Sequence, residues 1–159
     1  MKSKIKSVAA AGVMTLAAVA GIPGVAHAAT PTGDYCRNSS VMDWLGVESM
    51  PCITVRGDGA WMLQGAILND RGNLCPETHL QVNEVYNGQT LPLYGYDRWD
   101  PQGSQCGPHT FNGLVSSPPP KGHYYNLTLS YRLPHDVPGT NVKAGQVLDN
   151  VQSRVFWWN

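Results

Sequence analysis

The sequence predicts an all-β protein, a single small antiparallel β-sandwich of about seven or eight strands, with a β-barrel as the alternative. Three observations support this prediction. Apolar and polar residues alternate with period two along most of the chain, which is typical of strands. Turn-forming residues separate these stretches, in keeping with 17 glycines and 12 prolines. Four cysteines in a chain with an export signal predict two disulfides that staple the domain.

The first 28 residues have the pattern of a cleaved secretory signal peptide. A basic segment, Met1–Lys6, precedes a mostly apolar run, Val8–Ala20, and Ala26–Ala28 places small residues before the expected cleavage point. The apolar run is shorter than the roughly 20 residues that a membrane span needs. We therefore expect a signal peptide over 1–28 and a secreted, extracellular β-domain over 29–159. The short Ala-rich run and the cleavage site are typical of bacterial signal peptides.

The cysteines allow three disulfide connectivities. We favour sequential pairing, Cys36–Cys52 and Cys75–Cys106, which closes two loops of moderate length. In the chain-entropy account each loop stabilises the fold by about 3 to 4 kcal/mol. The chain has no C-x-x-C pair and its histidines are scattered, so we expect no metal site and no cofactor.

The strands can be assigned in order along the chain. Ser40–Val47 carries the only helical pattern, of one or two turns. Predicted strands follow at Cys52–Arg56 and at Trp61–Leu68, and the second is apolar on both sides, as expected of a central strand. Another strand begins at Leu80, and Val85 falls out of its alternation, which indicates a bulge.

The second half of the chain has the clearest strand and the strongest hairpin signal. Asn87-Gly88 lies between two strand-like runs and predicts a tight hairpin. In His123–Arg132, tyrosines and leucines share one face and polar residues share the other, which predicts one buried and one solvated face. The proline run Pro118–Pro120 must be extended loop. The other predicted strands are Thr90–Tyr96, Thr110–Val115, Asn141–Leu148 and Val151–Trp158.

The charge balance argues against two classes of partner. The formal net charge is zero, but three of the eleven basic residues lie in the expected signal peptide, so the mature chain carries about −3. Proteins that bind nucleic acid or anionic membranes need a surplus of Lys and Arg. We therefore expect no nucleic-acid partner and no membrane anchoring.

The densest group of candidate ligand-binding residues lies between Tyr94 and Ser104. Large amphipathic side chains offer both contact area and polar tips, as recognition surfaces require. We expect Trp99 and at least one of two tyrosines to be exposed there; the alternative is that Trp99 packs inward and Asp100 starts a turn. The candidate ligand-binding residues are Tyr94, Tyr96, Asp97, Trp99 and Asp100.

Catalysis finds little support in the sequence. Asp97 and Asp100 are only three residues apart, whereas a glycosidase needs two carboxylates on opposite walls of a cleft. The chain lacks a G-x-S-x-G nucleophile elbow. We assign no catalytic residue, and an enzyme is the least favoured of three classes.

The leading hypothesis is a non-catalytic extracellular binding module whose ligand, a glycan or a small molecule, contacts the Tyr94–Ser104 surface. The alternative is an inhibitor of a secreted hydrolase that binds its protein partner through Cys106–Pro120, because a disulfide-held loop loses little entropy on binding. A glycan binder should lose affinity when Trp99 is replaced and keep it when Cys106–Pro120 is altered. An inhibitor should show the reverse.

Overall fold

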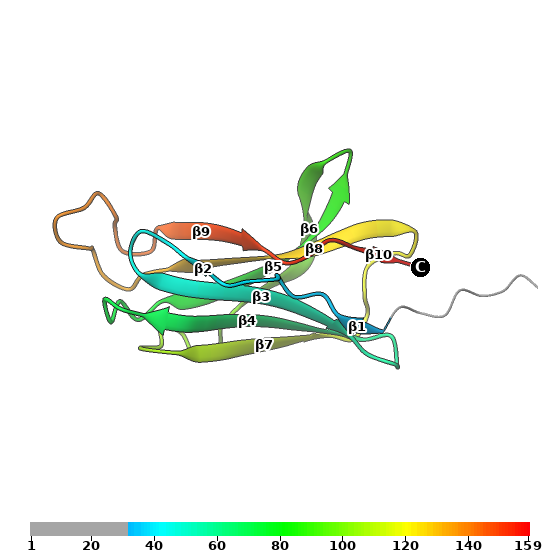
Figure 1. The fold of residues 1–159 in the computed structure, drawn as a ribbon, viewed down its shortest axis with the longest axis horizontal. Helices are drawn as coiled ribbons and strands as arrows, with labels where there is room; N and C mark the ends of the chain where they lie inside the picture. Colours follow the sequence, from blue (N-terminus) through cyan, green and yellow to red (C-terminus); the bar gives the residue numbers. More distant parts are fainter. Residues whose placement is uncertain (1–31) are drawn as a thin grey trace, which may run out of the picture.

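A computed structural model of the protein describes residues 32–159, with only the backbone given for 149 and 150. The predicted signal peptide lies outside the described residues. Within them, the chain forms ten β-strands and no helix, arranged as two antiparallel sheets. The sheets pack as two open layers (Figure 1). The predicted all-β sandwich is therefore confirmed, and the alternative of a closed barrel is not adopted.

The first sheet has the strand order β1–β3–β4–β7, and β2 also pairs with β3. Within the described residues, β7 pairs only with β4 and so forms one edge of this sheet. Its strands are β1 (Gly33–Asp34), β2 (Val41–Met42), β3 (Val47–Val55), β4 (Trp61–Asp70) and β7 (His109–Val115).

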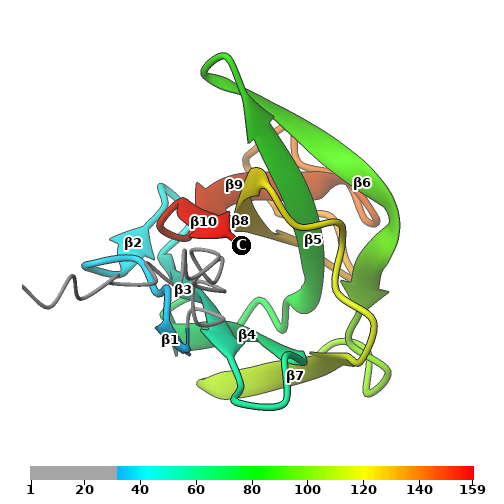
Figure 2. The same cartoon turned by 90° about the vertical axis from the view of Figure 1, so that its right-hand side faces the viewer.

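The second sheet has the order β10–β8–β5–β6, and β9 also pairs with β8. The tip of the β5–β6 hairpin projects away from both layers (Figures 1 and 2). Its strands are β5 (Glu77–Tyr86), β6 (Gln89–Trp99), β8 (His123–Arg132), β9 (Val147–Gln152) and β10 (Phe156–Trp158).

The turn residues named from the sequence make the hairpins. Asn87 and Gly88 both have positive φ, 49° and 76°, as a two-residue hairpin of this type requires. They join β5 to β6 with Tyr86 opposite Gln89. The β5–β6 pairing shifts register between Gln81 and Asn83, with the extra residues in β6. Val85 itself pairs in regular register with Thr90 and Tyr124, so the bulge predicted there is not formed.

Three further local predictions are wrong. The strand predicted over Val151–Trp158 is interrupted at 153–155, between β9 and β10. Ser40–Val47 is not helical, because the Asp43 carboxylate accepts hydrogen bonds from the N–H groups of Leu45 and Val47 and closes a turn there. Such local side-chain bonds compete with a helix. The predicted strand Asn141–Leu148 is mostly loop, and β9 begins only at Val147.

The core lies between the two sheets, and one glycine sets how closely they approach. A Cβ at Gly65 of β4 would lie 2.7 Å from Leu80 Cδ2 and 3.0 Å from Leu129 Cδ1, both in the opposite sheet. Hydrogen in place of a side chain therefore lets β4 touch β5 and β8 directly. This contact explains a glycine in the middle of a central strand, where glycine otherwise weakens pairing.

An aromatic cluster fills one end of the core. Trp61 is fully buried and meets the rings of Tyr125, Phe156 and Trp158 edge-on, at centroid distances of 5.4, 5.1 and 5.3 Å. The proline loop covers this end, because the Pro120 carbonyl accepts a hydrogen bond from the Tyr125 hydroxyl and the Pro119 carbonyl accepts one from Trp158 Nε1. The chain segment that follows β7 is thereby fixed to the core.

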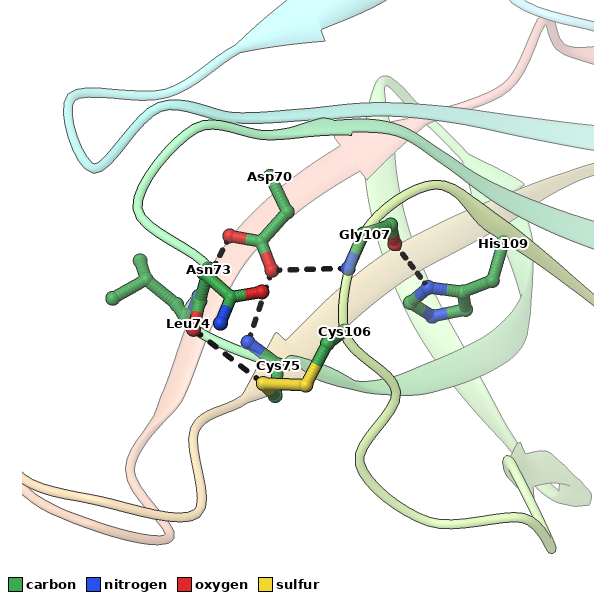
Figure 3. The surroundings of a disulfide bond; sticks show 7 residues. All are labelled: Asp70, Asn73, Leu74, Cys75, Cys106, Gly107 and His109. Atoms are coloured by element: carbon green, nitrogen blue, oxygen red, sulfur yellow. Dashed lines mark hydrogen bonds between the residues drawn. A yellow bond between two sulfur atoms is a disulfide. The ribbon is translucent and has the colours of Figure 1, made fainter.

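Both predicted disulfides, Cys36–Cys52 and Cys75–Cys106, are present. The second ties together two of the three connections that cross between the sheets within the described residues, β4 to β5 and β6 to β7. Asp70 lies beside it and accepts hydrogen bonds from the backbone N–H groups of Leu74 and Cys75, at 2.8 and 3.0 Å (Figure 3). This junction holds the two layers together at one end.

Candidate functional site

The solvent-facing side of the β10–β8–β5–β6 sheet, with β9, carries a ladder of polar side chains; we call this side the outer face. It arises because alternation along β5 and β8 sends apolar residues to the core and polar residues outward. Antiparallel pairing then sets these polar residues directly opposite one another. The opposed pairs are Glu77 with Arg132, His79 with Ser130, Gln81 with Thr128, and Asn83 with Asn126.

The amides in the middle of the ladder are held in fixed positions. Asn83 is 2% exposed, and its Nδ2 donates to Asn126 Oδ1 at 3.0 Å and to Thr128 Oγ1 at 2.8 Å. Asn126 Nδ2 in turn donates to Gln152 Oε1 of β9 at 3.1 Å. Gln81 Nε2 donates to the carbonyls of Val82 and Leu93. One polar atom of each of these amide side chains is therefore already hydrogen-bonded within the protein.

The other ends of these amides are free to bind. Among the described residues, no protein group bonds Gln81 Oε1, Asn83 Oδ1 or Gln152 Nε2. None of the three is a fully enclosed, unsatisfied atom. Two acceptors and one donor therefore lack a protein partner among the described residues; Gln81 and Gln152 are partly exposed, Asn83 is almost fully buried, and all three line the same hollow.

Trp99 of β6 forms the apolar boundary of this polar region. Its ring stacks on that of His79, with centroids 4.4 Å apart and planes 28° apart. The Arg132 guanidinium lies 4.3 Å from the Trp99 ring centroid and binds Glu77 through two hydrogen bonds of 2.6 and 2.9 Å. The indole is half-buried, and so less exposed than the sequence predicted, and it is held by its neighbours.

These residues line a hollow of about 400 Å³ on the outer face, which we call the Trp99 hollow. Its lining combines amide and hydroxyl groups with an indole and a proline ring. Mixed polar and aromatic linings of this size are typical of small-molecule and sugar sites. The lining residues are His79, Gln81, Asn83, Thr90, Pro92, Trp99, Thr128, Ser130, Val147 and Gln152.

The five ligand-binding residues predicted from the sequence do not all share this surface. Trp99 and Asp97 lie on the outer face, opposite His79 and Gln81. Tyr94 is fully exposed, at 103%, where β6 leaves its pairing with β5. Tyr96 packs against the core and donates its hydroxyl to the Ser117 carbonyl at 3.1 Å.

Asp100, the fifth predicted residue, is 5% exposed and closes a turn. Its carboxylate accepts hydrogen bonds from the Gln102 N–H and from Gln105 Nε2, at 2.9 and 2.6 Å. It borders a separate, smaller hollow beside β7. Asp97 and Asp100 therefore do not face a common cleft.

The segment assigned to the inhibitor alternative, Cys106–Pro120, has three parts. A disulfide-held turn comes first, the edge strand β7 follows, and the proline loop bound to the core ends it. His109 at the start of β7 contacts the Gly107 carbonyl through Nδ1 and Thr78 Oγ1 through Nε2, at 2.8 and 3.3 Å. Both of its ring nitrogens thus have protein partners.

Sequence reasoning missed most of the Trp99 hollow. The polar residues of His123–Arg132 do share the face away from the core, but the prediction that this face is solvated is only partly confirmed, because Asn126 and Ser130 are 1% and 4% exposed. The partners of that face come from β5, about 45 residues away, and no local pattern fixes their register. Alternation of polar residues at positions 77, 79, 81 and 83 was the available signal.

Burial lowers the pKa of His79 below its ordinary value of 6.5; Asp97, whose Oδ2 lies 3.9 Å from Nε2, acts in the opposite direction. His79 should therefore be neutral at pH 7, and Asp97→Asn should lower its pKa further. Because the unfolded chain binds this proton more readily, the free energy of unfolding should fall as pH drops from 6.5 through the folded pKa. NMR titration of the imidazole checks this, and a His79 pKa above 6.5 would contradict it.

The chain matches no protein family, no curated protein and no solved structure. No described helix is long and apolar enough to cross a membrane. The geometry of the outer face is therefore the basis for assigning a function.

Proposed function

We propose that this protein is a secreted, non-catalytic binding module that holds a glycan in the Trp99 hollow. The observation that carries the proposal is the polar ladder of β5, β8 and β9, which ends at the half-buried Trp99. Sugars present hydroxyl groups around an apolar ring, so they bind where fixed donors and acceptors adjoin an aromatic wall.

The free atoms of the hollow suit hydroxyl groups. Gln81 Oε1 and Asn83 Oδ1 can accept from a hydroxyl, and Gln152 Nε2 can donate to one. The described residues that line the hollow include no Lys, Arg, Asp or Glu, and the nearby Arg132 is paired with Glu77. A neutral polyhydroxylated ligand therefore fits this site better than an ionic one.

The extracellular location is part of the same proposal. Two disulfides indicate an oxidising environment, and the signal-peptide pattern of residues 1–28 supports export. N-terminal sequencing of the secreted protein is the direct measurement of this step, with a first residue of Ala29 expected.

Trp99→Ala should weaken glycan binding at least tenfold, because loss of a central aromatic anchor usually costs about 2 kcal/mol or more. Its effect on stability should be smaller, about 1 to 2 kcal/mol, since the ring is half-buried and loses one stacking and one cation–π contact. Calorimetric titration with ligands chosen from a glycan array measures the affinity, and urea unfolding measures the stability.

Two aromatic residues serve as matched controls. Trp44 lies in the β2–β3 turn with 70% exposure, and Tyr94 is fully exposed outside the hollow. Trp44→Ala and Tyr94→Ala should leave glycan affinity within twofold of wild type. If Tyr94→Ala abolished binding and Trp99→Ala did not, the ligand would sit at the tip of the Tyr94 segment instead. If only a secreted hydrolase bound, independently of Trp99, the inhibitor alternative would hold.

A further inference from the structure

A second hollow lies at the other end of the outer face, about 370 Å³ in volume, which we call the Trp157 hollow. Its lining includes Tyr86 and Asn87 at the turn of the β5–β6 hairpin, the tip of which projects from the sheets in Figure 1. Three aromatic side chains border it, Tyr86, Tyr124 and Trp157, with exposures of 61%, 51% and 44%. Exposed aromatic rings gathered in one place are unusual on a monomeric surface and indicate a binding site.

Two of these rings are held in a fixed arrangement. Trp157 of β10 lies directly opposite Tyr124 of β8, and their rings meet edge to face with centroids 4.8 Å apart. At the border of the hollow, His123 Nδ1 contacts Glu84 Oε1 at 2.7 Å. The Glu84 carboxylate therefore has a hydrogen-bond partner, and it is the only carboxylate among the described lining residues of this hollow.

The two hollows belong to one surface. Tyr124 alternates along β8 with the same parity as Asn126, Thr128 and Ser130, so all four face outward. Trp99 pairs with His79 of β5, which in turn pairs with Ser130 of β8, so Trp99 lies at the position of Ser130 along the sheet. Trp157 pairs with Tyr124. These two positions are six residues apart on β8, which corresponds to about 20 Å along the strand.

We propose that the outer face binds a linear, neutral glycan chain that spans both hollows, with Trp99 at one end and Trp157 at the other. This inference rests on the proposed function and specifies its ligand class. A single sugar cannot reach across about 20 Å. Between the two tryptophans the partly exposed side chains of Gln81 and Thr128 offer polar groups that a polyhydroxylated chain can bond, whereas Asn83 and Asn126 are almost fully buried. Protein interfaces are also rich in Tyr and Trp, so binding of a protein partner is the alternative outcome of the experiment.

Chain length tests the proposal. Wild-type protein is titrated with disaccharides and hexasaccharides of three neutral linear series: cello-, malto- and chito-oligosaccharides. In the series that binds, the hexasaccharide should bind at least tenfold more tightly than the disaccharide, because only the longer chain reaches the second aromatic anchor.

Trp157→Ala should remove the tighter binding of the hexasaccharide and leave the disaccharide affinity within twofold of wild type. Trp99→Ala should weaken the binding of both ligands. Trp44→Ala is the control, because it also removes an exposed indole but lies in the first sheet. Since Trp157 is 44% exposed, the variant should fold, which its circular dichroism spectrum checks.

The outcomes separate the two proposals. Equal affinity for disaccharide and hexasaccharide, with no effect of Trp157→Ala and loss of both ligands in Trp99→Ala, would overturn the extended site and leave the Trp99 site in place. A wild-type protein that bound no oligosaccharide of either length would overturn both. Binding of a protein that Trp157→Ala weakens, without glycan binding, would reassign this surface to a protein partner.

Discussion

Trp61→Ala is expected to lower the free energy of unfolding by about 3 to 5 kcal/mol, the usual cost of removing a large core aromatic. Trp61 has no exposed surface and contacts Tyr125, Phe156 and Trp158 at once, so its loss leaves a cavity bordered by rigid rings. Rings packed in this way cannot collapse readily into the space. Urea unfolding followed by far-ultraviolet circular dichroism measures the change.

Two further variants make the result specific. Trp61→Phe should cost less than Trp61→Ala, because it keeps a ring and removes an indole Nε1 that has no hydrogen-bond partner in the described structure. Trp44→Ala, at a residue with 70% exposure, should change stability by no more than about 0.5 kcal/mol. A Trp61→Ala protein as stable as wild type would mean that the aromatic cluster is not the main support of this end of the core.

Removing the Cys75–Cys106 disulfide is expected to lower the free energy of unfolding by about 3 to 4 kcal/mol. The cysteines are separated by 31 positions, and closing a loop of that length restricts the unfolded chain by this amount in the entropy model. The double variant Cys75→Ala/Cys106→Ala keeps the other bridge. Its urea m-value should rise, because a chain with one fewer crosslink exposes more surface when it unfolds.

Asp70 separates the contribution of the crosslink from that of the surrounding hydrogen bonds. Its carboxylate bonds the backbone N–H groups of Leu74 and Cys75 whether or not the sulfurs are joined. Asp70→Ala in the oxidised protein should therefore lower stability without changing the m-value. A loss below about 1 kcal/mol in the double cysteine variant would show that these hydrogen bonds hold the junction without the bridge.

The sequence predicted the strands and turns well where local chemistry decides them. The bounds of His123–Arg132 match β8, and the Asn87-Gly88 hairpin is formed as expected. The sequential disulfides were also predicted. The errors occur where a side chain competes with the backbone pattern, as Asp43 does in the segment that resembled a helix.

The candidate site was predicted less completely, because it depends on which strands become neighbours. Trp99 was named from its local cluster, but its partners, His79 and Arg132, come from two other strands. Asp100 was grouped with Trp99 because the two are adjacent in sequence, yet its carboxylate turns into the following loop. Adjacent residues in an extended chain point to opposite sides, so a cluster in sequence need not form a cluster in space.

The edge strand β7 has a consequence for how the protein behaves in concentrated solution. Within the described residues its outer side pairs with no other strand, and its seven residues, His109–Val115, include no lysine, arginine or carboxylate. Such an edge can recruit a strand from another copy and start aggregation. Pro108 directly before it and Pro118–Pro120 shortly after it limit the length available for pairing. The prolines therefore confine pairing along this open edge to the short stretch between them.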